Sequence, residues 1–583
     1  MQRLTTRNSA QRWLFSGMAS AAVLVLGVFV ALQLPQYSGF YSPKQVAAVV
    51  PMNDMSVAAQ RKIDARPPRF EFYSILPDSK FEMQADTLLA RQKSRAAGAA
   101  GISGDVVASP GYQEEGRDRF DTAAANPIKR TSEEPVSTFS IDVDTASYSF
   151  VRRQLNAGVL PQKSAVRLEE MVNYFPYDYP LPPDSSQPFS THVTVLDSPW
   201  KAGNKLVHIG IQGYELTGAQ PHANLVFLLD VSGSMDSPDK LPLVKQSLGL
   251  LLDRLQPQDT VAIVVYAGAA GTVLEPTQVK DKQKILAALN RLQAGGATAG
   301  AQGIQLAYQL AESQFIEDGV NRIVLATDGD FNVGIYDTEE LKGFVERKRE
   351  SGVFLSVLGF GQGNYHDALM QTLAQNGNGV AAYIDTLGEA QKVLVDEATS
   401  ALFPIAKDVK IQVEFNPATV SEYRLLGYET RMLAEEDFNN DTVDAGDIGA
   451  GHSVTAIYEI TPAGSDSGAF ADSRYAEVPA SAGKSDEYGY LKLRYKLPQE
   501  SKSRLISQPI GMHTQATPDM LREAQFATAV AGFAQLLEGG KYLAGWGFAD
   551  ALELAQANRG DDPYGYRAEF IQLIRKAQVA GAM

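Results

Sequence analysis

Cysteine is absent from this chain and histidine is scarce, with six residues in 583. Without cysteine the chain can form no disulfide, no thiolate metal site and no cysteine nucleophile, and it has no cysteine to carry a lipid anchor. None of the histidines forms an HExxH pair, so the signature of a zincin-type hydrolase is missing. The histidines are His192, His208, His222, His366, His452 and His513.

Positive charge is also in the minority. The 52 basic and 68 acidic residues give a formal net charge of −16, which argues against a general nucleic-acid binder. Apolar residues make up 44% of the chain and charged residues 21%, which is typical of globular proteins and not of disordered ones. The length predicts several domains.

The N-terminal segment carries the signal of a membrane anchor. Arg3, Arg7 and Arg12 precede a stretch without charge from Trp13 to Pro43, long enough to span a bilayer as a helix. We expect a basic cytoplasmic tail at 1–12 and a transmembrane signal anchor at 13–35. A cleaved signal peptide is the alternative, and both interpretations place the rest of the chain outside the cytoplasm.

Residues 36–130 are rich in small and polar residues and predict a flexible, low-complexity stalk. One apolar patch interrupts this composition. It is either a linker segment that touches the folded body or a docking motif for an envelope partner. The patch consists of Phe70, Phe72, Tyr73, Ile75, Leu76 and Phe81.

Residues 222–404 show strands that alternate with helices, beginning with the continuous apolar run Leu225–Leu229. Such a run is typical of a strand buried on both faces of a parallel sheet. The alternation predicts a doubly wound α/β domain, in which ligands bind at the carboxyl ends of the strands. Further strands are expected at 260–266, 323–327, 353–360 and 380–384, and helices at 280–293, 300–314, 337–350, 365–375 and 387–401.

Oxygen-bearing side chains gather at the expected strand ends. Asp230, Ser232 and Ser234 follow the first strand, Thr298 lies in a glycine-rich loop, and Asp328 follows another strand. Two carboxylates and three hydroxyls, without nitrogen or sulfur, suit Mg²⁺, Mn²⁺ or Ca²⁺. Few charged ligands leave such an ion able to accept a carboxylate from a partner. The alternative is that these residues only cap helices and shape turns.

With these residues the segment resembles a von Willebrand factor type A domain with a metal-ion-dependent adhesion site. Its DxSxS motif matches Asp230, Ser232 and Ser234, its threonine matches Thr298, and its TDG aspartate matches Asp328. The resemblance implies a bound divalent cation, Mg²⁺ being the first choice, and a protein ligand that supplies an acidic side chain.

The flanking segments resemble those of a narrower bacterial family of such proteins, often labelled Ca-activated chloride channel homologues. The matching segments are 134–148, 169–175, 437–441 and 449–452 with the C-terminal region. Members are frequently lipoproteins, whereas this chain lacks cysteine and is expected to use its helix. The resemblance implies a bacterial envelope protein, and the predicted helix makes it a single-pass protein of the inner membrane, with most of the chain in the periplasm.

Alternating apolar and polar residues predict strands in the flanking region 131–220, at 189–197 and 205–214, and in a β-rich region at 405–500. We expect these strands to form one sandwich into which the α/β domain is inserted, followed by a helical region at 501–583. The acidic loop Asp437–Asp447 is either a calcium site or a solvated turn. Gly483-Lys484-Ser485 lacks the first glycine of a phosphate loop, so no nucleotide site is predicted.

Three functions remain. The first is a membrane-anchored envelope protein that binds a protein partner through its metal site. The second is a structural assembly factor of an envelope complex, in which the metal only holds the protein's own loops. The third is a metal-assisted hydrolase, which is disfavoured because no GxSxG, HExxH or histidine–carboxylate cluster is visible. We therefore expect no enzyme.

Overall fold

The computed structural model describes residues 120, 124–142, 144–183, 187–216, 221–296, 300–329, 338–361, 366–397, 403–471, 486–513 and 516–582. The predicted anchor at 13–35 and the stalk up to residue 119 lie outside these residues. Among the described helices, none has the length and hydropathy needed to cross a membrane.

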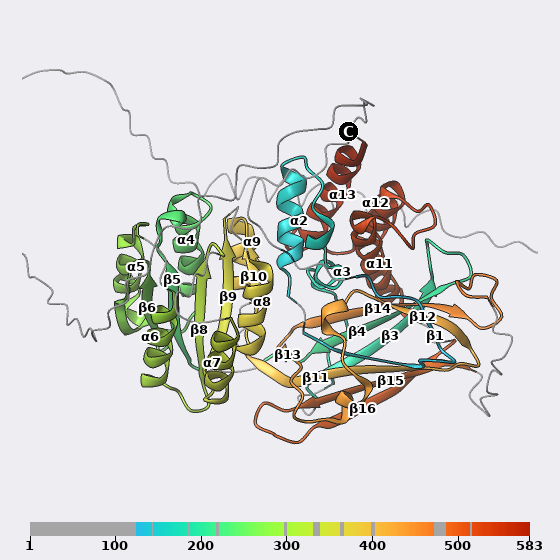
Figure 1. The fold of residues 1–583 in the computed structure, drawn as a ribbon, viewed down its shortest axis with the longest axis horizontal. Helices are drawn as coiled ribbons and strands as arrows, with labels where there is room; N and C mark the ends of the chain where they lie inside the picture. Colours follow the sequence, from blue (N-terminus) through green and yellow to red (C-terminus); the bar gives the residue numbers. More distant parts are fainter. Residues whose placement is uncertain are drawn as a thin grey trace, which may run out of the picture. The chain divides into compact units, whose positions relative to one another are not determined.

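The α/β domain is built on a six-stranded sheet with the order β10-β9-β8-β5-β6-β7 (Figure 1). All neighbours are parallel except β7, which pairs antiparallel with β6. The strands are β5 (Ala223–Asp230), β6 (Thr260–Tyr266), β7 (Ala270–Gln278), β8 (Val320–Thr327), β9 (Phe354–Phe360) and β10 (Ala381–Ile384).

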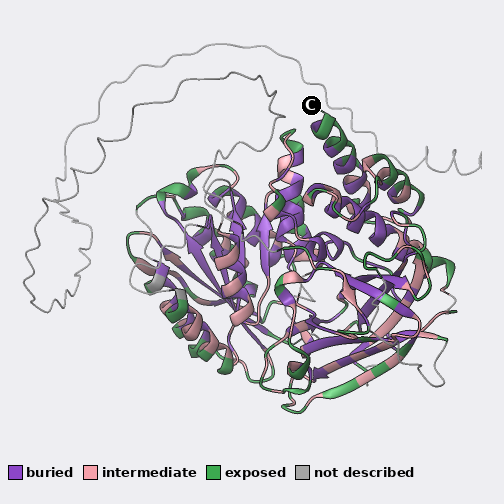
Figure 2. Ribbon diagram, turned by 45° about the vertical axis from the view of Figure 1, so that its right-hand side comes forward, coloured by how far each residue is buried: buried purple, intermediate pink, exposed green. Residues whose placement is uncertain are grey.

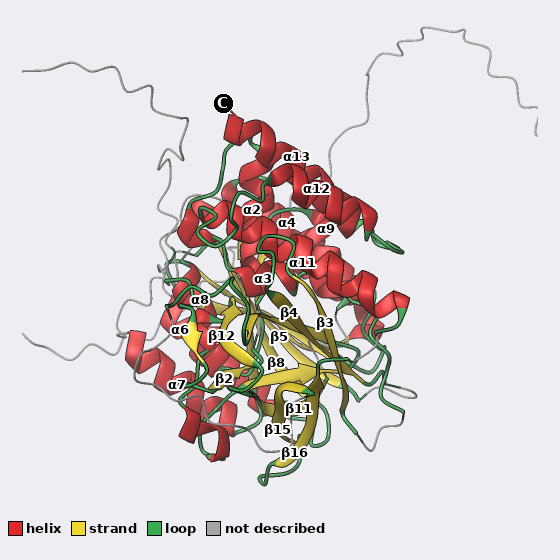
Figure 3. Ribbon diagram, turned by 90° about the vertical axis from the view of Figure 1, so that its right-hand side faces the viewer, coloured by secondary structure: helices red, strands yellow, loops and turns green. Residues whose placement is uncertain are grey.

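Helices cover both faces of this sheet because successive strand residues point to opposite faces. In β5, Leu225, Phe227 and Leu229 belong to one hydrophobic cluster, whereas Val226 and Leu228 belong to another. Figure 2 shows the strands of this sheet as mostly buried, and Figure 3 shows them among the helices. The predicted doubly wound domain is therefore confirmed. Its helices are α4 (Leu241–Leu252), α5 (Lys282–Arg291), α6 (Gly300–Ser313), α7 (Thr338–Glu350), α8 (Asp367–Asn376) and α9 (Leu387–Gln391), with short helical turns at η2 (Gly233–Asp236), η3 (Val279–Asp281) and η4 (Lys392–Asp396).

Strands from both flanks of the α/β domain form a sandwich, as predicted. One sheet has the order β1-β12-β14-β4-β3, and β4 from the N-terminal flank pairs antiparallel with β14 from the C-terminal flank. The other has the order β13-β11-β15-β16, with β2 also paired to β11. The strands are β1 (Lys129–Arg130), β2 (Val136–Ser140), β3 (Phe189–Asp197), β4 (Lys205–Gly213), β11 (Pro404–Phe415), β12 (Val420–Leu426), β13 (Gly446–Gly449), β14 (Ser453–Pro462), β15 (Glu487–Lys496) and β16 (Arg504–Gly511).

Two short segments differ from expectation. Lys129 and Arg130, which we placed at the end of the stalk, pair with the edge strand β12, because backbone hydrogen bonds there outweigh the polar composition. The loop at 437–447 is bound by the protein's own cations: Lys410 Nζ donates to the carbonyl oxygen of Asn440 at 2.6 Å, and Arg494 contacts Asp441 at 2.9 Å. Its oxygens therefore have protein partners.

A helical layer covers the outer face of the sheet that contains β4. Leu206, Leu426 and Ile457 of that sheet share a hydrophobic cluster with Phe526, Phe570 and other helix residues. The predicted helical C-terminus is confirmed from Pro518 onwards. The first part of the region expected at 501–583 is instead strand β16, because its backbone pairs with β15 and extends the sandwich. The helices of this layer are α2 (Ala146–Asn156), α3 (Leu168–Val172), α11 (Pro518–Glu538), α12 (Phe548–Ala557) and α13 (Tyr566–Ala582), with turns at η1 (Lys163–Ala165), η5 (Glu429–Arg431) and η6 (Glu435–Asn439) elsewhere in the flanks.

Candidate metal centre

The two predicted carboxylates lie at the ends of neighbouring parallel strands. β5 ends at Asp230, and Asp328 follows the last residue of β8, which is paired with β5. Both residues are buried: 0% of the surface of Asp230 and 1% of the surface of Asp328 is exposed. The carboxyl ends of parallel strands share one edge of the sheet, and this register therefore brings two distant acidic residues to one place.

The loop after β5 orders the hydroxyl groups. The backbone N–H of Ser232 donates to Asp230 Oδ1 at 2.8 Å, and the hydroxyl oxygens of Ser232 and Ser234 lie 3.0 Å apart. On the other side, Thr327 Oγ1 donates to Asp230 Oδ2 at 3.3 Å. The Asp230 carboxylate is therefore held by both of the strands that build the site.

The electrostatics of Asp230 favour a cation. The pKa of Asp230 is raised to about 6. Burial is the main cause and the charge of Asp328 adds to it, whereas the hydrogen bonds from Ser232 oppose the shift. The carboxylate is costly to ionise here without a positive charge beside it. A divalent cation would remove that cost.

Thr298, the fifth predicted ligand, lies outside the described residues. The chain just before it is attached to the serine loop: Gly295 N donates to Val231 O at 2.8 Å, and Gly233 N donates to Gly296 O at 3.1 Å. These bonds join the glycine-rich loop to the loop that carries Ser232 and Ser234.

Sequence reasoning missed Lys240. Its Nζ lies 2.9 Å from Asp328 Oδ2, and the two side chains are only 8% and 0% exposed. The backbone of Gly361 makes room for it, because a Cβ at Gly361 would lie 2.3 Å from Lys240 Cε. One signal was available: Lys240 immediately precedes α4, where the helix dipole favours acidic residues, so a lysine there calls for a local carboxylate.

The donor set fits a hard cation. Carboxylate and hydroxyl oxygens are ligands for Mg²⁺, Mn²⁺ or Ca²⁺. In the described part of the chain, no group of three or more His, Asp and Glu side chains could hold a metal ion. A cation at Asp230 and Asp328 would thus depend on the hydroxyls as well as on the two carboxylates.

Comparisons with known proteins agree with this architecture. The model of the von Willebrand factor type A domain matches residues 224–396, and a model described as von Willebrand factor matches 114–208. The model of the C-terminal region of the uncharacterized protein YfbK matches 400–580. Over 480 residues the chain is 45% identical to the uncharacterized protein YfbK of Escherichia coli K12, covering 81% of this chain and 82% of that protein.

This chain belongs to the YfbK family of bacterial von Willebrand factor type A domain proteins.

More distant similarity is confined to part of the chain. Human inter-alpha-trypsin inhibitor heavy chain H4 is 28% identical over 221 residues, which cover 36% of this chain and 24% of that protein. A solved von Willebrand factor type A protein from Catenulispora acidiphila is 15% identical, with a TM-score of 0.39, over 66% of this chain and 89% of that chain.

The YfbK-family assignment accounts for the flanks as well as for the α/β domain. The domain type mediates protein–protein interaction and commonly binds a divalent metal. Proteins with this domain type, including the relatives named above, are generally not enzymes. For this chain, the partner and the metal are matters of proposal.

Proposed function

We propose that this YfbK-family protein is a membrane-anchored envelope protein that binds an acidic side chain of a partner protein through a divalent cation. Asp230, Ser232, Ser234, Thr298 and Asp328 hold the cation, which is Mg²⁺ or, less favoured, Mn²⁺ or Ca²⁺. The observation that carries the proposal is the pair of buried carboxylates at neighbouring strand ends, beside two hydroxyls 3.0 Å apart.

The charge of the site supports an acidic ligand. Asp230 and Asp328 supply two negative charges, and Lys240 supplies one positive charge at 2.9 Å from Asp328. A divalent cation leaves this group with a net charge of +1, from −2 + 1 + 2. A carboxylate from a partner neutralises that excess, whereas a lysine or arginine would be repelled.

The anchor and the location rest on the sequence. The uncharged segment that begins at Trp13, after Arg3, Arg7 and Arg12, supports a single-pass helix in the bacterial inner membrane. In this proposal the folded part of the chain lies in the periplasm. The protein binds no nucleic acid or nucleotide.

The hydroxyl contacts favour binding over catalysis. Ser232 and Ser234 share a hydrogen bond with each other, and the backbone of Ser232 is bonded to Asp230. A serine nucleophile would instead need a general base within hydrogen-bond reach. We therefore propose a binding protein and no enzyme.

The experiment is capture of partners from detergent-solubilised membranes by the full chain, with Mg²⁺, with chelator, and with Mg²⁺ restored. The test variant combines Asp230→Ala and Ser232→Ala. The matched control combines Asp239→Ala and Ser237→Ala, a hydrogen-bonded serine–aspartate pair on the same loop. We expect capture to be lost with chelator and in the test variant, and kept in the control.

The structural assembly factor is the competing function, because the same bonds that place Asp230 also join two loops. It predicts that chelator lowers the thermal stability of the protein while the partner stays bound. Capture by a folded Asp230→Ala/Ser232→Ala variant, or capture that is indifferent to chelator, contradicts metal-dependent binding.

A further inference from the structure

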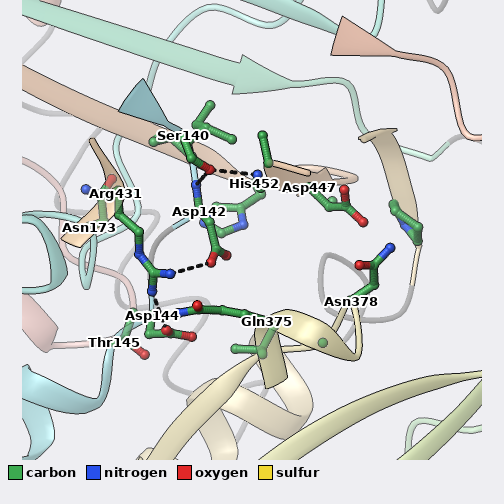
Figure 4. Close-up of a pocket in the computed structure, with 18 of the residues that line it drawn as sticks. Ser140, Asp142, Asp144, Thr145, Asn173, Gln375, Asn378, Arg431, Asp447 and His452 are labelled. Atoms are coloured by element: carbon green, nitrogen blue, oxygen red, sulfur yellow. Dashed lines mark hydrogen bonds and ion pairs between the residues drawn. The ribbon is translucent and has the colours of Figure 1, made fainter. Parts of the chain in front are cut away.

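A second polar site lies at the opposite end of the α/β domain from the candidate metal centre. Here a cavity of about 260 Å³ lies between the α/β domain and the sandwich (Figure 4). Arg322 of β8 lines it, six residues before Asp328. At a strand rise of about 3.3 Å per residue the two residues are about 20 Å apart, so the cavity is separate from the metal centre.

Arg322 is a buried cation that forms no ion pair with any residue the structure describes. Only 3% of the surface of Arg322 is exposed. Its Nη1 donates to Ser356 Oγ at 2.7 Å, and its guanidinium lies over the ring of Phe354. The Nε–H has no hydrogen-bond partner. Burial lowers the pKa of Arg322 to about 10, and Asp447 acts against that shift. A buried guanidinium with no carboxylate is costly and calls for an anion.

Asp447 on β13 is the complementary group on the sandwich wall. It accepts a hydrogen bond from the backbone N–H of Asp408 at 3.3 Å, and it takes part in no ion pair within the described structure. The pKa of Asp447 is raised to about 7, mainly by burial and in part by the charge of Asp408. Figure 4 shows its carboxylate on the side of the cavity where Asn378 also lies.

The other charged groups of the cavity wall are already paired. Arg431 contacts Asp142 at 3.0 Å and Asp144 at 2.9 Å, and Asp444 contacts Arg349 at 2.6 Å. Burial lowers the pKa of His452, which keeps it neutral. One positive and one negative group, Arg322 and Asp447, are thus left facing the same cavity from two different domains.

We infer that this cavity binds a small zwitterion of the α-amino acid class, with its carboxylate on Arg322 and its ammonium on Asp447. A simple anion would satisfy Arg322 but would bring a second negative charge towards Asp447 and the acidic wall. A simple amine would satisfy Asp447 but would bring a second positive charge towards Arg322. The volume lies below the usual range for drug-sized ligands and suits a molecule of a few heavy atoms.

The ligand would bridge β8 of the α/β domain and β13 of the sandwich. The bridge involves no residue of the metal centre, so binding is independent of the divalent cation. This inference therefore stands apart from the proposed adhesive function, and each can fail without the other.

The test is isothermal titration calorimetry on the detergent-solubilised full chain in the presence of chelator. The probes are glycine, L-alanine and L-serine, with acetate and methylamine as matched half-ligands. We expect saturable binding of at least one amino acid, and binding of each half-ligand weaker by about tenfold or more, because each makes only one charged contact.

Arg322→Gln and Asp447→Asn are the test variants. Each is expected to weaken amino acid binding by about 10- to 100-fold, the effect of losing a charge-assisted contact. Glu414→Gln is the matched control, since this carboxylate of β11 belongs to the same sandwich, does not line the cavity and is paired with Lys492 at 2.9 Å. It is expected to bind as the unaltered protein does.

Several outcomes overturn the inference. They are the absence of heat with all three amino acids, equal affinity for a half-ligand, or unchanged binding in both test variants. If Arg322→Gln fails to fold, Asp447→Asn, which removes no buried cation, decides the question.

Discussion

At the scale of single residues, the buried pair of Lys240 and Asp328 sets the charge of the proposed metal centre. Lys240 Nζ lies 2.9 Å from Asp328 Oδ2, and both side chains are almost wholly excluded from solvent. The lysine therefore stabilises the carboxylate when no metal is bound, and it opposes the approach of a divalent cation. Metal affinity is weaker than two carboxylates alone would give.

Lys240→Met removes this competition. Without metal, the free energy of unfolding should fall by about 3 kcal/mol, the cost of leaving a buried carboxylate unpaired. Affinity for Mg²⁺ should rise by about tenfold or more, since one nearby positive charge is gone. Calorimetry measures the affinity and chemical denaturation the stability.

Lys245→Met is the control for that change. Lys245 lies on the same helix α4, but its Nζ donates to Leu292 O, away from the two aspartates. The control should leave Mg²⁺ affinity unchanged. Unaltered affinity in Lys240→Met would show that the lysine does not oppose the cation.

Glu538, at the end of α11, is a second residue with a testable charge. Its pKa is raised to about 8. Burial is the main cause, the charges of Glu429 and Glu169 add to it, and Arg424 opposes the shift. The pKa of Glu538 in the folded state therefore lies above its ordinary pKa in the unfolded state. At a pH between these two values, the folded state keeps a proton that the unfolded state has lost. This contribution to stability is full below about pH 4.5 and is lost as the pH rises towards 8.

Glu538→Gln should therefore stabilise the protein at pH 8.5, on the order of 1 kcal/mol, and change little at pH 5. Denaturant unfolding at the two pH values measures the difference. Glu553→Gln, at an exposed position of α12, should show no such pH dependence. Equal effects of Glu538→Gln at both pH values would exclude a raised pKa.

At the scale of elements, α2 is attached to the α/β domain by buried charge. Arg152 pairs with Asp385 and, at 2.8 Å, with Glu389, both of which follow β10. It also donates to Tyr174 at 2.9 Å and contacts Glu569 of α13 at 3.3 Å. One side chain thus links the α/β domain to two helices of the helical layer.

Arg152→Met should lower the free energy of unfolding by about 3–5 kcal/mol, because it leaves buried carboxylates without a cation. Arg504→Met removes an exposed pair with Glu500 and should leave the free energy of unfolding nearly unchanged, because solvent screens that pair. Denaturant unfolding compares the two. Similar losses in both variants would show that the Arg152 cluster contributes no more than a surface ion pair.

Elements with a strong local pattern were predicted well. The apolar run of β5 and the helix expected at 300–314, found at Gly300–Ser313, follow from periodicity alone. β7 was missed because an edge strand that contains Gly271 and Pro276 has neither the alternation nor the composition of a strand. Its pairing with β6 supplies what the local sequence does not.

At the scale of the whole molecule, the α/β domain interrupts a sandwich that needs both flanks. β4 lies between β3 and β14, and β1 and β2 pair with β12 and β11, so three of the four N-terminal strands pair directly with a C-terminal one. When these strands pair across the inserted domain, residues more than 200 positions apart in the sequence become neighbours in one sheet. The α/β domain has its own sheet, and one face of that sheet packs into a cluster made almost wholly of the domain's own residues, whereas the cluster on the other face continues into the sandwich.

A chain that ends after residue 404 should keep a folded α/β domain and lose protection in β3 and β4. A two-stranded hairpin is marginally stable in water once its sheet neighbours are gone. Hydrogen exchange of backbone amides measures both parts. Adding residues 405–583 as a separate chain should restore protection, whereas a protected β4 in the truncated chain would contradict the interlocked sandwich.

The sequence alone was enough to predict the α/β alternation, the sandwich strands with clear alternation, such as β3 and β4, and the motif that contains Asp230, Ser232 and Asp328, because periodicity and short motifs are local properties of the chain. The strands β12, β13 and β16 were not predicted. Only the tertiary structure decided that Lys240 neutralises Asp328, that Arg152 joins three elements, and that Arg322 and Asp447 face one cavity. Those contacts depend on which strands become neighbours and on how two domains pack, and burial then gives each charge an importance that its place in the sequence does not reveal.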